Sequence, residues 1–152
     1  MLKPIVLGIA GCIHFNDNGR DICDATFVRL KLALTRASHN AGRDIFFICS
    51  GNSVKAIKDF FETEENTKLM KISKIPSENV IVSPVISSIS AFSSIVSDAK
   101  KYVPECKKII VFSSRWYFPL TKIAWMIYAR ISKLRVEVVR AKNQNYLSGG
   151  TS

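Results

Sequence analysis

Small polar residues and one arginine follow the apolar runs of this 152-residue sequence, where hydroxyls, backbone amides and a guanidinium could bind an anion. Glycine also lets a ligand approach the backbone closely. Ordinary explanations exist for the same residues, since they also suit a tight turn, helix caps and a solvated surface arginine. The candidates are Gly8, Gly11, Ser50, Gly51, Asn52, Ser87, Ser90, Ser114 and Arg115.

Groups for catalysis are few. Cys12, His14 and Asp17 lie close together in the sequence, but they match no known set of nucleophile, base and acid. A Cys-x-His pair without further ligands does not predict a metal site. The G-x-G-x-x-G dinucleotide motif is absent, and no acidic residue ends the second apolar run to bind a ribose. An enzyme built on these three residues is therefore the least supported alternative, and no catalytic residue is assigned.

Five apolar runs predict the strands that would position the candidate residues. The three in the middle of the chain are continuous or nearly so, which is typical of strands covered on both faces. They alternate with helical patterns, and this alternation implies right-handed crossovers in a parallel sheet. The predicted strands are Pro4–Ala10, Asp44–Cys49, Asn79–Val82, Lys107–Phe112 and Arg135–Val139.

Helical patterns separate these strands, and the acidic stretch Glu62–Asn66 predicts a turn or surface loop. The last pattern follows Pro119 and has an apolar stripe that comprises Leu120, Ile123, Ile127, Ile131 and Leu134. The other helical segments are residues 24–41, Asn52 or Ser53 to Phe61, a short piece around Lys68–Lys74, and Ser87–Ser90 to about Tyr102.

Together these patterns predict one Rossmann-like, three-layer α/β domain over residues 1–142, with a mostly parallel five-stranded sheet. The tail at residues 143–152 has turn composition and is expected to be flexible. Ligands of such sheets bind beyond the carboxyl ends of the strands. We therefore expect the candidate residues to converge on one cleft at that edge.

Charge is distributed unevenly along the chain. Lys and Arg number 22 against 12 acidic residues, and residues 100–152 hold eleven basic residues against Glu105 and Glu137. This asymmetry indicates an anionic partner, either a phosphorylated ligand, an acidic membrane surface or, less strongly, nucleic acid. A solvated lysine-rich surface explains it equally well.

Four scattered cysteines without C-x-x-C spacing predict reduced thiols, and Cys49, at the end of an apolar run, predicts a buried one. The apolar run after Lys3 is too short to cross a bilayer. We expect a cytoplasmic protein, with peripheral contact to the inner membrane as an option, unless an N-terminal anchor has been removed.

Short motifs occur in a fixed order along residues 4–140: I-V-L-G at 5–8, R-L at 29–30, C-S-G at 49–51, I-P-S-E-N-V-I-V at 75–82 and V-F-S-S-R-W-Y-F-P at 111–119. In this order they resemble the YdcF-like domain of unknown function, the family of the bacterial envelope proteins SanA and ElyC. The resemblance implies a Rossmann-like fold, a link to cell-envelope biogenesis, and binding of a nucleotide or S-adenosylmethionine. It also adds Arg29 to the candidate site.

Three polar anchors of that family are replaced in this chain. Pro84 stands where the family has an acidic residue, Tyr117 where it has a histidine, and Leu120 where it has an arginine. A phenol titrates at about 10 and cannot replace an imidazole in proton transfer at neutral pH. We therefore expect binding of a small anionic ligand without the family's chemistry. The alternative is a non-catalytic interaction protein whose basic C-terminal third docks on an anionic membrane or nucleic acid.

Overall fold

One sheet of five parallel strands organises the molecule. The computed structural model describes residues 3–10, 24–40, 43–51, 54–84, 88–114, 123, 126–127, 130 and 133–141. The strands lie in the order β3-β2-β1-β4-β5, and every neighbouring pair is parallel. This confirms the predicted Rossmann-like α/β fold. The strands are β1 (Ile5–Ala10), β2 (Ile45–Gly51), β3 (Val80–Pro84), β4 (Lys108–Ser114) and β5 (Arg135–Ala141).

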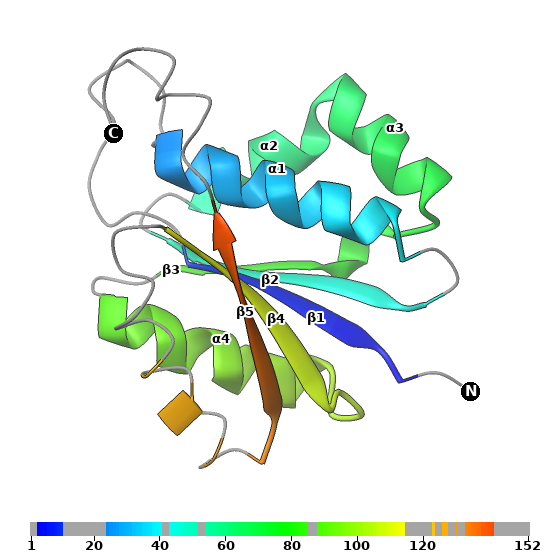
Figure 1. Cartoon of the computed structure of the whole chain (residues 1–152). Helices are drawn as coiled ribbons and strands as arrows, with labels where there is room; N and C mark the ends of the chain where they lie inside the picture. Colours follow the sequence, from blue (N-terminus) through cyan, green and yellow to red (C-terminus); the bar gives the residue numbers. More distant parts are fainter. Residues whose placement is uncertain are drawn as a thin grey trace.

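Helices cover both faces of the sheet, which gives three layers (Figure 1). On one face lie α1 (Asp24–Ser38), α2 (Val54–Glu62) and α3 (Glu64–Ile72), and on the other lies α4 (Ser88–Tyr102). A short 3-10 helix, Ser77–Asn79, leads into β3, and the Asn79 side chain donates to the Ile45 carbonyl at 2.9 Å. Because the helices run back against the strands, the amino ends of α1 and α4 lie toward the strands' carboxyl ends.

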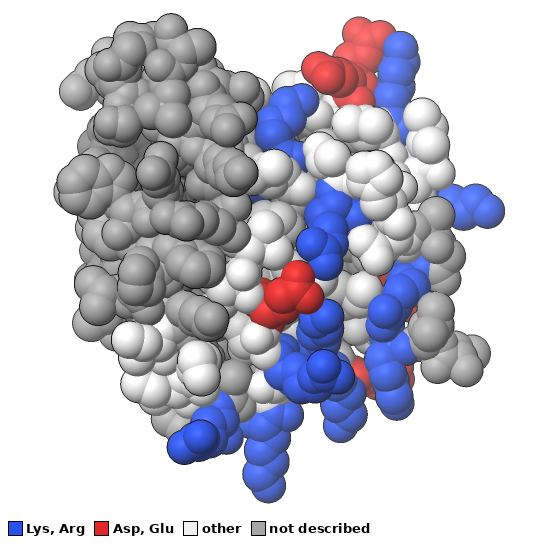
Figure 2. All heavy atoms as spheres, viewed as in Figure 1, with Lys and Arg blue, Asp and Glu red and all other residues white. Residues whose placement is uncertain are grey.

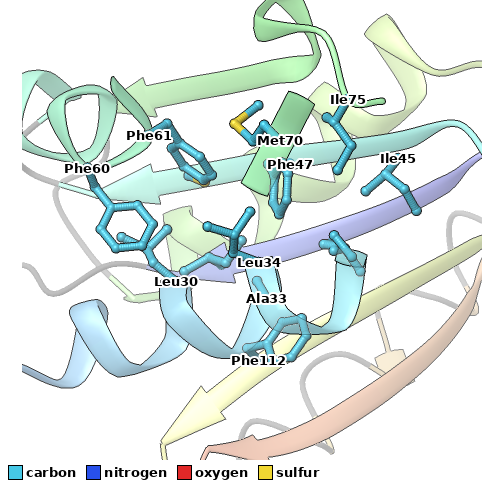
Figure 3. Packing of buried hydrophobic residues seen from close by; sticks show 14 of the residues in the cluster. Leu30, Ala33, Leu34, Ile45, Phe47, Phe60, Phe61, Met70, Ile75 and Phe112 are labelled. Atoms are coloured by element: carbon cyan, nitrogen blue, oxygen red, sulfur yellow. The ribbon is translucent and has the colours of Figure 1, made fainter. Parts of the chain in front are cut away.

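Each face of the sheet buries its own apolar cluster, because successive strand residues point to opposite faces. Leu7, Phe47 and Phe112 pack under α1, α2 and α3 in the larger cluster, which Figure 3 shows from close by. The second cluster holds Ile48 and Ile109 against α4. Central strands that are apolar on both faces explain why their sequences are nearly continuous apolar runs.

Four strands extend past the ends that the apolar runs predict. β2, β3, β4 and β5 each continue for two more residues, which are polar or small in β2, β3 and β4. The ladder pairs these residues too, for example Ser50 with Ser83 and Gly51 with Pro84. Backbone hydrogen bonding does not depend on an apolar side chain. Strand ends predicted from apolar residues alone therefore fall two residues short.

The predicted turn at Glu62–Asn66 is wrong, because α3 begins at Glu64. Thr63 caps this helix, and its hydroxyl accepts from the Asn66 amide at 3.4 Å. Glu64 and Glu65 then lie in the first turn, where negative charge interacts favourably with the helix dipole. The acidic stretch is therefore a helix start.

Of the apolar stripe predicted after Pro119, the structure describes Ile123, Ile127 and Leu134, whereas Leu120 and Ile131 lie outside the described residues. Leu134 packs against the cluster under α4. Ile123 and Ile127, however, are 56% and 55% exposed. An apolar stripe normally faces the core, so these two residues depart from the expected pattern.

Glu137 of β5 links β4 to α1 through two ion pairs. Its carboxylate accepts from Lys108 at 2.9 Å and from Arg36 at 3.1 Å. The hydrogen bond from Lys108, with a smaller contribution from Arg36, holds the pKa of Glu137 below its ordinary value of 4.5. All three side chains are more than one-third exposed, so water screens much of this attraction.

Glu137→Gln is expected to lower the free energy of unfolding at neutral pH by up to about 1 kcal/mol. A carboxyl whose pKa falls on folding stabilises the protein above its unfolded pKa, and this contribution is lost as the pH falls through the folded value. Urea unfolding of wild type and variant should therefore converge as the pH drops below 4.5. Asp59→Asn is the control, because it removes an exposed carboxylate that pairs with Lys55 at 2.8 Å within α2. A Glu137→Gln deficit that persists at acid pH would contradict an electrostatic role.

Candidate functional site

The carboxyl ends of the strands meet at one edge of the sheet. Ala10 at the end of β1 pairs with Ser50, and Ser114 at the end of β4 pairs with Ala141. From β1 the chain moves outward to β2 and β3, and it then crosses back through α4 to β4 on the other side of β1. The strand order therefore reverses between β1 and β4. In parallel α/β sheets, ligands bind at this reversal, beyond the carboxyl ends.

Arg29 lies at this edge. It comes from the second turn of α1, and only 9% of the residue is exposed. Its guanidinium donates to the carbonyl oxygen of Ala10, the last residue of β1. The charge is thus held directly beside the strand-order reversal. A guanidinium carries five N–H donors in a planar fork that matches phosphate or carboxylate.

Ser50 and Gly51 also lie at the edge, but as strand residues. They are the last two residues of β2, and both are buried. Ser50 was expected to follow the strand, but it belongs to β2, which ends at Gly51 and not at Cys49. Strand alternation places Ser50 on the same face as Ile48, under α4, whereas Arg29 approaches from the α1 face. The two side chains therefore approach the edge from opposite faces of the sheet.

Gly8 lies in β1, within the predicted strand Pro4–Ala10, and not in the tight turn that its residue type also allowed. It lies inside the strand, two residues before its end, and it is buried. A Cβ at this position would lie 3.0 Å from Ile95 Cγ2 of α4 and 3.0 Å from Val111 Cγ1 of β4. The absence of a side chain thus lets α4 pack closely on the sheet, which explains the glycine without a ligand.

Sequence reasoning missed a polar contact near the end of β3. The Ser83 hydroxyl donates to Asp98 Oδ2 of α4 at 2.6 Å. Both residues are partly buried. Asp98 is the one acidic residue of α4, in a helix that is otherwise apolar, serine-rich or basic. A single acidic residue in such a helix was the sequence feature that could have indicated this contact.

Several predicted site residues lie outside the described residues, namely Gly11, Asn52, Ser87 and Arg115, and so do Cys12, His14 and Asp17. Ser90 and Ser114 lie in α4 and at the end of β4, where only their backbone is described. Arg29, Ser50 and Gly51 thus lie at the carboxyl edge, and their convergence on one cleft stays a prediction. The expected flexible tail at 143–152 also lies outside the described residues.

The described cysteines do not supply a reactive thiol. Cys49 is fully buried, as predicted, and burial raises the pKa of its thiol far above the ordinary value of 9.0. Burial also raises the pKa of Cys106, whose sulfur lies 3.0 Å from the Lys108 carbonyl oxygen. Thiols of this kind stay protonated and are poor nucleophiles.

Basic side chains gather at the opposite, amino edge of the sheet. Parallel strands all begin there, and α4 ends there. In Figure 2, Lys and Arg side chains are frequent in the lower and right-hand parts of the visible surface, with a few acidic side chains among them, and Figure 1 places the strand starts there. We call this set the basic edge; it comprises Lys3, Arg43, Lys100, Lys101, Lys107, Lys108, Lys133 and Arg135.

A pocket of about 260 Å³ opens within the basic edge. The end of α4, the loop before β4 and the residues before β5 line it. Its three cations are Lys100, Lys107 and Lys133, and its other lining residues are Ala99, Val103, Pro104, Cys106 and Leu134. An apolar floor with three ammonium groups around it suits an anion that carries an apolar part.

No protein-family model, curated protein or solved structure matches this chain. None of the helices in the described part of the chain has the length and apolar character needed to cross a bilayer.

Proposed function

We propose that this chain is a binding domain for a small anionic ligand at the carboxyl edge of the sheet. The observation that carries the proposal is the buried guanidinium of Arg29, held against the end of β1 beside the strand-order reversal. A guanidinium held at this edge offers planar N–H donors that match a phosphate or carboxylate group.

The fold supports the same edge for a second reason. The amino ends of α1 and α4 both point toward it, and a helix amino end carries partial positive charge and free backbone amides. Nucleotides and S-adenosylmethionine are the first ligands to test, because both carry groups that a guanidinium and backbone amides recognise. The order of the sequence motifs supports a divergent YdcF-like domain with a role linked to the cell envelope.

Arg29→Met is expected to weaken binding of the responding ligand about tenfold, the loss of roughly one charge-assisted hydrogen bond. A thermal-shift screen of nucleotides, S-adenosylmethionine and phosphosugars selects the ligand, and calorimetric titration then gives Kd for each variant. Arg29→Lys keeps the charge but not the planar fork, so an intermediate Kd is expected.

Arg36→Met is the matched control, because it is the same change two turns later in α1, on a side chain that pairs with Glu137. It should leave Kd unchanged. The melting temperature of each variant without ligand separates a loss of binding from a loss of stability. A folded Arg29→Met protein that binds as tightly as wild type would contradict the site, and so would a wild type that binds no member of the screen.

Turnover distinguishes a binding domain from an enzyme. Phosphoester, nucleotide and methyl-donor substrates should all remain unchanged in the presence of the protein. Turnover that disappears on changing Cys12, His14 or Asp17 would instead assign an enzymatic function.

A further inference from the structure

Between β4 and β5 the structure describes three exposed apolar residues and one arginine, and from here on we call this set the stripe. Ile123, Met126, Ile127 and Arg130 have helical backbone. Their spacing of three, one and three residues places them on one face of a helix. The three apolar members are 56%, 57% and 55% exposed, and Arg130 is exposed as well. Several exposed large apolar side chains on one helix face indicate a surface that becomes covered.

The stripe and the lysine pocket belong to the same side of the molecule. Figure 1 shows the described residues between β4 and β5, coloured orange, on the α4 side of the sheet. Arg130 precedes the pocket residue Lys133 by three positions, and Leu134 packs against the cluster under α4. Along the sequence, the stripe therefore lies a few residues before Lys133, one of the three lysines of the pocket.

Tyr102 adds an interfacial aromatic residue to this side. It ends α4, is 49% exposed, and lies with its ring centroid 5.1 Å from the ammonium of Lys101. Tyrosine with an adjacent lysine is typical of the level of lipid headgroups, where the ring meets both apolar and polar surroundings.

We propose that this side of the molecule docks on the surface of an anionic phospholipid bilayer. Ile123, Met126 and Ile127 enter the boundary between headgroups and acyl chains, and Lys100, Lys107 and Lys133 bind headgroup phosphates. Charge complementarity selects the anionic bilayer. The apolar stripe favours a bilayer over nucleic acid, because protein surfaces that bind nucleic acid are polar and contact phosphates and bases with polar groups. This surface is distinct from the carboxyl edge, so the inference stands independently of the proposed ligand site.

Two lysines in the same backbone conformation provide a matched test. Lys133 has φ 58° and Lys74 has φ 57°, both in the left-handed region that glycine adopts without strain. Lys133→Gly and Lys74→Gly therefore remove the same charge with little disturbance of the backbone. Only Lys133 lines the pocket, whereas Lys74 follows α3 on the opposite face of the sheet.

The full chain is mixed with vesicles of phosphatidylcholine alone, or of phosphatidylcholine and phosphatidylserine in equal amounts, and the bound fraction is measured by co-sedimentation. Wild type should bind only the anionic vesicles. Lys133→Gly should reduce the partition constant about fivefold, the effect of one lysine near an anionic surface. Lys74→Gly should change it less than about twofold, because salt screens distant charges.

Met126→Gln tests the apolar contact without a change in net charge. Since Met126 is exposed, the fold should tolerate the change, and circular dichroism verifies this. Binding to anionic vesicles should weaken several-fold. Equal losses for Lys133→Gly and Lys74→Gly would overturn the proposed surface. Unchanged vesicle binding by Met126→Gln would also overturn it, as would tighter binding of duplex DNA or RNA than of anionic vesicles.

Discussion

Phe47→Ala is expected to reduce the free energy of unfolding by about 3–5 kcal/mol, as for other large aromatic residues truncated in a core. Phe47 lies at the centre of β2 and is fully buried. Its ring packs against that of Phe61, with centroids 5.0 Å apart, within the cluster under α1, α2 and α3 (Figure 3). The cavity left by alanine would lie between the sheet and three helices, where collapse is difficult.

The neighbouring residue is a matched control for Phe47. Phe46→Ala deletes the same atoms one position earlier, on the opposite face, where the ring is only partly buried. Water fills the space left at a partly exposed site, so the loss should be much smaller. Urea unfolding of both variants measures the difference. Equal losses would contradict the assignment of the two faces.

Gly8→Val is expected to destabilise the protein by about 3 kcal/mol, the upper part of the range for adding atoms to a packed core. Even a single Cβ at Gly8 would lie 3.0 Å from methyl groups of Ile95 and Val111. These neighbours are 0% and 1% exposed, so they have little room to shift. The change should push α4 away from the sheet.

A double-mutant cycle tests this steric explanation. Gly8→Ala and Val111→Ala should each destabilise the protein alone, but the combined variant should lose less than the two losses together. The reason is that Val111→Ala removes the methyl group that the new Cβ would meet. Rescue should be partial, because Ile95 Cγ2 remains. Strict additivity would indicate that Gly8 is required for backbone conformation and not for close packing.

The sequence alone predicted the fold and the order of its elements. Apolar runs and helical periods are local properties, so they locate strands and helices without knowledge of their neighbours. Their alternation implied the parallel sheet that the structure contains. Strand ends were harder to predict, because residues such as Ser50 continue the ladder through backbone hydrogen bonds that carry no apolar signal.

The candidate site was predictable in part. Arg29 was included as a candidate because of a two-residue motif. Its position in the predicted helix did not by itself indicate that the guanidinium would lie at the end of β1. The reason for Gly8 was not predictable, because a sequence does not distinguish a glycine in a turn from one that accommodates a helix. The contact between Ser83 of β3 and Asp98 of α4 joins two residues that are fifteen positions apart, beyond the range of local patterns.

The sequence by itself determined the parallel α/β architecture and the excess of positive charge, because periodicity and composition are properties of the chain. Only the tertiary structure decided which surfaces carry that charge and which apolar residues stay in water. The eight cations of the basic edge come from the starts of four strands and the end of α4, and they gather because parallel strands begin at the same edge. Ile123 and Ile127 have the spacing of core residues, yet they are exposed. Whether an apolar residue is buried depends on what its helix packs against. The spacing of apolar residues within the helix does not reveal this.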